Sequence, residues 1–225
     1  MWQSRTKGLI GEDNVNKLNS AKIIVFGVGG VGGHAIESLA RAGVGTLTIV
    51  DKDVVDITNI NRQIVALFST VNISKVQVMK QRLLDINPNI KVTAIQEFVT
   101  EENLLNFKLN EYDFVVDAID NVTAKIAIAK ECFNNNIRLI SCMGTGNKLC
   151  PEMFEIADIN STSVCPLCKV VRKKLKELKV NKLTVLYSKE QPVTSGERTP
   201  ASISFSPSIA GIRIAEYVIK QLLSI

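Results

Sequence analysis

The stretch KIIVFGVGGVGGHAIESLARAGVGTLTIVDKDVVDITNINRQ, residues 22–63, decides the fold of this chain. Residues 23–26 form a short β-branched run that is typical of a buried strand. Glycines follow at positions 27, 29, 30, 32 and 33, and the apolar pattern of a helix starts near Val31. A second strand, residues 46–50, ends at Asp51. This order predicts a nucleotide site at the glycine turn, because backbone N–H groups and a helix N-terminus attract phosphate.

The glycine pattern alone leaves two classes of nucleotide open. Asp51 follows Gly32 by 19 residues, a spacing that lets an acid bind the ribose of a nicotinamide dinucleotide as well as that of ATP. The residues that come next favour ATP, because amide and cationic side chains suit a charged triphosphate tail. They are Asn59, Arg62 and Lys75.

The other periodicities predict a Rossmann-like, doubly wound α/β fold. Further strands are expected at residues 91–95, 114–120, 137–142, 151–159 and 183–187. Further helices are expected at residues 74–85, 122–134, 165–182 and 207–223. Residues 1–20 predict an extended entry and then a helix with Leu9, Ile10, Val15 and Leu18 on one face. We expect a mostly parallel sheet with antiparallel strands in the C-terminal half, within a single domain of residues 1–225.

Segments spread along nearly the whole chain carry a family resemblance. Besides residues 27–33 and 42–53, they are LIGE (9–12), NINRQ (59–63), INP (86–88), DAID (117–120), MGTGNK (143–148), TSVCP (162–166), YSKE (187–190) and SISFSP (202–207). In this order they resemble the ubiquitin-activating-enzyme superfamily of ATP-dependent adenylating proteins, which includes the molybdopterin and thiamine sulfur-carrier activators. More narrowly, the chain resembles the tRNA threonylcarbamoyladenosine dehydratase branch.

The resemblance implies an activity and a set of site residues. The activity is adenylation of the threonyl carboxylate of a modified tRNA by ATP, then ring closure with net loss of water. A ThiF- or MoeB-like sulfur-carrier adenylyltransferase shares the same nucleotide residues and stays the alternative. The implied ligands are ATP and Mg²⁺, and the implied partners are tRNA, a second copy of the chain and a sulfur-transfer protein. The implied site residues are Gly27, Gly29, Gly30 and Gly32 for adenosine and α-phosphate, Asp51 for ribose, Asn59, Arg62, Lys75 and a partner subunit's Arg5 for the triphosphate, and Asp120 for Mg²⁺.

Two of these assignments also follow from the residue pattern. Lys75 falls in the first turn of the helix that Ser74 is expected to cap, where a cation opposes the helix dipole unless an anion is nearby. Asp120 lies beyond a buried strand, at the sheet edge where open α/β folds bind ligands. Its alternative role is to cap the following helix. Asp117, on the same strand, is expected to be structural.

Histidine and cysteine chemistry is disfavoured. His34 is the only histidine, which argues against a Ser-His-Asp triad and against a site with several histidine ligands. Cys165 and Cys168 form a CxxC motif, but no second closely spaced pair completes a structural zinc site. We therefore expect these two cysteines to pack at the start of a helix capped by Thr162 or Ser163.

Composition favours a cytoplasmic protein and places basic charge in the C-terminal part. No apolar run approaches the roughly 20 residues that span a bilayer, no signal peptide is apparent, and five unevenly spaced cysteines suit a reducing compartment. Residues 161–225 carry 11 Lys and Arg against 4 Asp and Glu, whereas residues 1–160 carry 16 against 18. Seven of these cations lie in residues 169–182, where Val171, Leu175 and Leu178 are expected to face inward. With the resemblance, this predicts contacts with tRNA phosphates.

Overall fold

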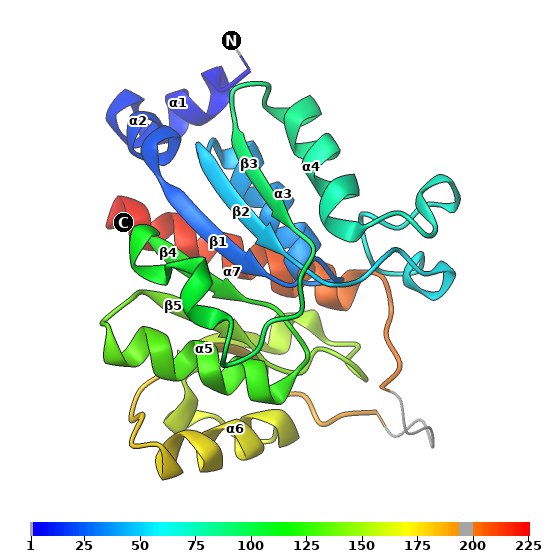
Figure 1. Ribbon diagram of the computed structural model, residues 1–225, viewed down its shortest axis with the longest axis vertical. Helices are drawn as coiled ribbons and strands as arrows, with labels where there is room; N and C mark the ends of the chain where they lie inside the picture. Colours follow the sequence, from blue (N-terminus) through cyan, green and yellow to red (C-terminus); the bar gives the residue numbers. More distant parts are fainter. Residues whose placement is uncertain (1, 194–199) are drawn as a thin grey trace.

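A seven-stranded sheet runs through the centre of the molecule (Figure 1). The computed structural model describes residues 2–193 and 200–225. The strands are β1 (Lys22–Phe26), β2 (Thr46–Val50), β3 (Lys91–Ile95), β4 (Phe114–Asp117), β5 (Leu139–Cys142), β6 (Phe154–Asp158) and β7 (Thr184–Ser188). Their order is β3-β2-β1-β4-β5-β7-β6, and only the β6–β7 pair is antiparallel among the strands described. The predicted fold class is confirmed.

Helices cover both faces of this sheet. They are α1 (Ser4–Ile10), α2 (Glu12–Ser20), α3 (Gly32–Ala42), α4 (Lys75–Ile86), α5 (Val122–Asn134), α6 (Pro166–Glu177) and α7 (Phe205–Leu223). Short 3-10 turns lie at Ile57–Asn59, Phe68–Thr70, Leu104–Phe107, Leu109–Glu111, Pro151–Met153 and Ile159–Ser161. Along β1, Ile23 and Val25 pack with α3, α4 and α7, whereas Ile24 and Phe26 pack with α5. This alternation is why β1 is apolar throughout.

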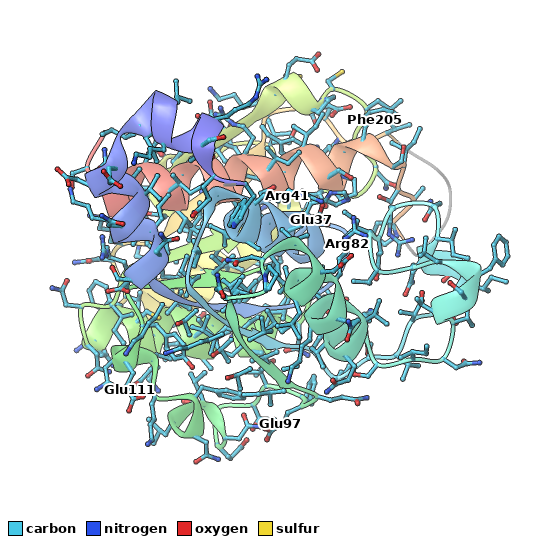
Figure 2. The ribbon with its side chains drawn as sticks, turned by 90° about the horizontal axis from the view of Figure 1, so that it is seen from above. Glu37, Arg41, Arg82, Glu97, Glu111 and Phe205 are labelled. Carbon is cyan, nitrogen blue, oxygen red and sulfur yellow. The ribbon has the colours of Figure 1, made fainter. Side chains whose placement is uncertain are left out.

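An ionic contact joins α3 to α4 on the face of the sheet that α3, α4 and α7 cover (Figure 2). Glu37 on α3 accepts hydrogen bonds from Arg41 on the same helix, at 2.8 Å, and from Arg82 on α4. The glutamate is largely buried, so the two guanidinium groups supply the partners that water would otherwise provide. Within the described residues, no helix is long and apolar enough to cross a membrane.

The N-terminal segment differs from the prediction. Residues 4–20 form two helices, α1 and α2, which meet at Gly11 with φ +82°, a backbone angle that glycine readily adopts. Val15 and Leu18 are buried as expected, but Leu9 is 85% exposed. The turn at Gly11 breaks the helical periodicity, so residues on either side of it no longer share a face.

Three predictions about the ends of α4 and α6 are also wrong. The Ser74 side chain does not cap α4, and the first N–H of that helix, on Lys75, donates to the carbonyl of Asp53 instead, at 3.1 Å. Cys165, rather than Thr162 or Ser163, is the N-cap residue of α6. At the other end α6 stops at Glu177, so Leu178 leaves the helical face and is 44% exposed. Val171 and Leu175 are buried as predicted.

Candidate nucleotide-binding site

A cavity of about 280 Å³ opens at the carboxyl ends of the parallel strands. Its wall contains seven of the residues predicted for the nucleotide: Gly27, Gly29, Gly30, Asp51, Arg62, Lys75 and Asp120. They come from the segments that follow β1, β2 and β4 and from the start of α4. Parallel strands end at one edge of the sheet, and this shared edge brings together residues far apart in the sequence.

The glycine turn needs two of its glycines for close backbone packing. Gly27 has φ +94°, and a Cβ there would lie 2.6 Å from the carbonyl oxygen of Ala118. Ala118 follows β4, the strand that pairs with β1. A Cβ on Gly32 would lie 1.9 Å from the carbonyl oxygen of Gly27. Gly32 therefore closes the turn from behind and does not line the cavity, whereas Gly29 and Gly30 do. The first turn of α3 thus begins directly behind a cavity wall made of backbone.

Asp51 is held in place by backbone N–H groups on both sides. Its Oδ2 accepts a hydrogen bond from Val28 at 2.7 Å, and its Oδ1 accepts one from Asp53 at 2.9 Å. The carboxylate is thereby fixed between the glycine turn and the end of β2. Because each carboxylate oxygen can accept more than one hydrogen bond, both keep capacity for the hydroxyl groups of a ribose.

The two predicted cations differ in their surroundings. The guanidinium of Arg62 donates to two neutral oxygens, the carbonyl of Thr58 at 2.9 Å and Oδ1 of Asn61 at 2.8 Å. Lys75 is only 5% exposed, and its Nζ lies 2.9 Å from Oδ2 of Asp53. The anion expected near Lys75 is therefore present in the chain itself, so its place at a helix start does not by itself indicate a bound phosphate.

Asn59 lies behind the cavity wall. Its Oδ1 accepts a hydrogen bond from the N–H of Asp56 at 3.2 Å, and its carbonyl accepts from the N–H groups of Arg62 and Gln63 at 3.0 and 2.9 Å. The side chain is buried and is not part of the cavity lining. In this structure Asn59 shapes the turn that presents Arg62.

The predicted acids and Arg5 occupy three different environments. Asp120 is exposed and lines the cavity, and the alternative capping role belongs to Asn121, whose Oδ1 accepts from Ala124 at 2.9 Å. Asp117 is fully buried and pairs with Lys125, so it is structural as predicted. Arg5 is exposed on α1 and does not line the cavity of its own chain. Figure 1 shows α1 beside the amino ends of the strands, whereas the cavity opens at their carboxyl ends.

Several residues of the wall were not found from the sequence. Gln63 is buried, lines the cavity, and its Oε1 has no hydrogen-bond partner among the described residues. Phe98 lies in the stretch after β3, under the ammonium of Lys52 at 4.7 Å from its ring centre. Ser202 and Pro207 arrive from the far end of the chain. Gln63, Ser202 and Pro207 carried a signal, since they lie in the NINRQ and SISFSP segments of the family resemblance, whereas Phe98 carried none.

The unusual histidine and cysteines lie outside this cavity. His34 shares a 2.9 Å hydrogen bond with Ser208, which ties α3 to α7, and burial lowers the pKa of this histidine. Cys165 and Cys168 pack in the apolar cluster beneath α6, as expected. The neighbouring thiol of Cys168 and nearby backbone N–H groups lower the pKa of Cys165 below the usual range of a thiol. Within the described residues, no three His, Cys, Asp or Glu side chains gather as a metal site.

The sequence and the fold of this chain are similar to those of known nucleotide-binding proteins. The sequence model of the ThiF family matches residues 3–225. This chain belongs to the ThiF family. The tRNA threonylcarbamoyladenosine dehydratase of Bacillus subtilis is 42% identical to it, over 98% of this chain and 94% of the relative. A crystal structure of the Escherichia coli tRNA N6-threonylcarbamoyladenosine dehydratase in complex with ATP superimposes with a TM-score of 0.93 at 33% identity, over 99% of this chain and 95% of that one.

The family also contains the alternative class of enzyme. The sulfur carrier protein ThiS adenylyltransferase of Escherichia coli is 37% identical to this chain, over 61% of this chain and 55% of the relative. That match is shorter than the one to the dehydratase of Bacillus subtilis. The resemblance to the dehydratase branch is confirmed.

Proposed function

We propose that this chain is an ATP-dependent tRNA threonylcarbamoyladenosine dehydratase. The observation that carries the proposal is the cavity itself, which contains Asp51, an acid placed to hold ribose, and the cations Arg62 and Lys75. Among the described residues, Arg62 has no acidic partner, whereas Lys75 is paired with Asp53. A nicotinamide dinucleotide has less need of cations at that position, whereas a triphosphate requires them. The extent of the match to the dehydratase of Bacillus subtilis supplies the substrate class. A tRNA substrate suits a cytoplasmic location.

In the proposed reaction, the cavity serves mainly to position and to neutralise charge. ATP is a substrate, with its ribose on Asp51 and its phosphates against the backbone of the glycine turn. An oxygen of the threonyl carboxylate forms a bond to the α-phosphorus, and the bond to the departing pyrophosphate breaks. The activated carbonyl is then attacked from within the same modification, which closes a ring and releases AMP with the oxygen of the lost water. Such chemistry depends on donors that are already aligned, and Arg62 is the donor we assign to the developing charge.

Magnesium is proposed at Asp120. The carboxylate is exposed at the cavity wall, and oxygen ligands of this kind suit Mg²⁺. Because the described residues offer no cluster of three ligands, substrate phosphate oxygens and water would have to complete the coordination. When bound there, the ion would neutralise phosphate charge during transfer.

A homodimer is proposed because Arg5 is out of reach of its own cavity. The side chain is exposed on α1, next to Leu9, an apolar side chain that is also exposed. An arginine that serves the triphosphate must then come from a second copy of the chain. Mixing an Arg5→Ala variant with an Arg62→Ala variant tests this, since a mixed dimer holds one cavity with both arginines. Partial recovery of activity is expected, and no recovery would argue against the exchange.

The decisive experiment is mass spectrometry of threonylcarbamoyladenosine-containing tRNA after incubation with the protein and ATP. A mass loss of one water in the modified nucleoside, with release of pyrophosphate, is expected. Arg62→Ala should abolish both while the melting temperature stays unchanged, and Arg62→Lys should restore little because the planar fork is lost. Arg213→Ala is the matched control, since it removes a surface arginine paired only with Glu216. Pyrophosphate exchange driven by a diglycine-tailed carrier protein, and not by tRNA, would establish the sulfur-carrier alternative.

A further inference from the structure

Helix α6 has an apolar side fixed to the body of the protein and a lysine side facing out. Cys168, Val171 and Leu175 are buried in the cluster formed with α5, β5 and β7. Lys169, Lys173 and Lys176 follow at intervals of four and three residues, which aligns them on one face of a helix. All three are exposed. The lysines therefore stand on a rigid platform and not on a mobile loop.

One of the cations in this segment has a structural role. The guanidinium of Arg172 donates to the carbonyl oxygens of Ile159 and Thr162 at 3.1 and 3.0 Å, and so joins α6 to the turn after β6. Lys174 pairs with Glu177 at 3.2 Å. Two of the seven cations in residues 169–182 therefore have partners within the chain. The other five are Lys169, Lys173, Lys176, Lys179 and Lys182.

The remaining lysines lack acidic partners, and they are close together in the sequence. Within the described residues, no carboxylate oxygen lies within 4 Å of their ammonium groups. Elsewhere on the described surface, some lysines have a carboxylate partner, whereas Lys17, Lys22 and Lys91 are exposed and have none, which suits them as controls for charge alone. The three unneutralised charges on one face of α6, those of Lys169, Lys173 and Lys176, repel one another, a cost that a bound polyanion removes.

The position of α6 connects these lysines to the substrate cavity. Cys165 and Cys168 pack in one cluster with Met143, and two and three residues after Met143, Thr145 and Gly146 line the cavity. The helix starts beside that wall and its 12 residues extend over about 18 Å. In Figure 1 it lies at the lower edge of the molecule. A polymer with one residue in the cavity would pass along this face.

We propose that the exposed lysines of α6, Lys169, Lys173 and Lys176, together with Lys179 and Lys182 in the segment that follows the helix, bind the phosphate backbone of the substrate tRNA while the modified nucleoside occupies the cavity. This inference rests on the proposed function and adds the surface that receives the rest of the RNA. The lysine side chains supply charge without aromatic neighbours between them, so the contact is independent of sequence and sensitive to salt.

The test compares two triple variants of the full chain. Lys169→Gln/Lys173→Gln/Lys176→Gln removes three charges from α6, and Lys17→Gln/Lys22→Gln/Lys91→Gln removes three exposed charges from α2, β1 and β3. Binding of modified tRNA is measured from low to high salt. Each lost phosphate contact reduces the slope of log affinity against log salt by about 0.7–0.9, so the α6 variant should lose about 2–3 from the slope and the control nothing.

A second measurement separates this surface from the chemistry. With the threonylcarbamoyl-adenosine nucleoside as a small substrate, the α6 variant should release pyrophosphate at the wild-type rate, and its melting temperature should match that of the control. An unchanged salt slope, or wild-type protein that does not bind tRNA, overturns the surface. If the α6 variant loses binding to anionic vesicles or to polyglutamate but still binds tRNA like the wild type, the proposed surface is overturned as well. Wild-type protein that binds tRNA through α6 but yields no dehydrated nucleoside would overturn the proposed function alone.

Discussion

Replacing Lys125 should destabilise the protein more than any surface substitution. Its ammonium is buried on α5, where it donates to Oδ2 of Asp117 at 2.9 Å and to Oγ of Ser141 at 3.3 Å. Lys125 is 2% exposed and Asp117 is fully buried. The contact joins α5 to the ends of β4 and β5, directly below the loop after β4 that forms part of the cavity wall. Lys125→Met keeps most of the side chain and removes the charge.

The magnitude follows from the carboxylate left behind. Removing one partner of a buried ion pair costs about 3–5 kcal/mol, because the other charge remains buried without compensation. For a chain of this length, 1 kcal/mol changes the melting temperature by about 2–4 °C, so a decrease of about 6–20 °C is expected. The double variant Asp117→Asn/Lys125→Met should recover most of this loss. An asparagine retains an oxygen for the N–H of Ile119, which Asp117 accepts at 3.2 Å.

Thermal and urea unfolding of the two variants and the wild type check this. ATP affinity, measured below the unfolding range, should fall in the single variant, because Asp117 also orients the loop that contains Asp120. A Lys125→Met protein that unfolds within about 1 kcal/mol of wild type would refute the argument. A double variant no more stable than the single one would show that lost packing, and not the stranded charge, causes the destabilisation.

Two further predictions concern α3. Glu37→Gln should lower the stability at pH 7: burial opposes the charge of Glu37, but hydrogen bonds from Arg82 and Arg41 hold its pKa below the usual 4.5. That stabilisation is present above the unfolded pKa and is lost as pH falls through the folded pKa, so urea unfolding should show the difference from wild type narrowing below about pH 4.5. Gly32→Ala should abolish nucleotide binding and lower the melting temperature, because its Cβ would lie 1.9 Å from the carbonyl oxygen of Gly27; calorimetric ATP titration that matches wild type would contradict this.

The sheet and its helices were predictable from the sequence because each depends on a repeating pattern. The apolar runs of β1, β2 and β4 are long enough, and their flanking turns clear enough, to locate all three strands. Among the helix ends, both bounds of α5 agree with the predicted residues 122–134, whereas the first contact of α4 and the end of α6 were not predictable. The first N–H of α4 finds its partner in the carbonyl of Asp53, and Leu178 turns outward because α6 stops one residue earlier. Both outcomes depend on tertiary contacts that propensity does not contain.

Most of the residues that were predicted from motifs line the cavity, but Gly32 and Asn59 lie behind its wall, and residues from distant segments were missed. Asp51, Arg62 and Asp120 line the cavity, since each follows a recognisable strand or turn. Ser202 joins them only because the segment before α7 returns to the same sheet edge. The pairing of Lys75 with Asp53 was not predictable either, because a short-range pattern does not fix which of two neighbouring acids, Asp51 or Asp53, faces a lysine.

That pairing changes how a triphosphate would be held. Lys75 is already neutralised by Asp53 at 2.9 Å, so a phosphate that binds Lys75 must displace or share a carboxylate, and the net electrostatic gain is small. Arg62 contacts only neutral oxygens and gives up no ion pair, which makes it the stronger contributor from within the chain. A triphosphate carries more negative charge than one such arginine offsets. Lys52, which also lines the cavity, can offset part of this deficit from within the chain. The remainder is a physical reason to expect further positive charge, and it agrees with the proposed roles of Mg²⁺ at Asp120 and of Arg5 from a second copy.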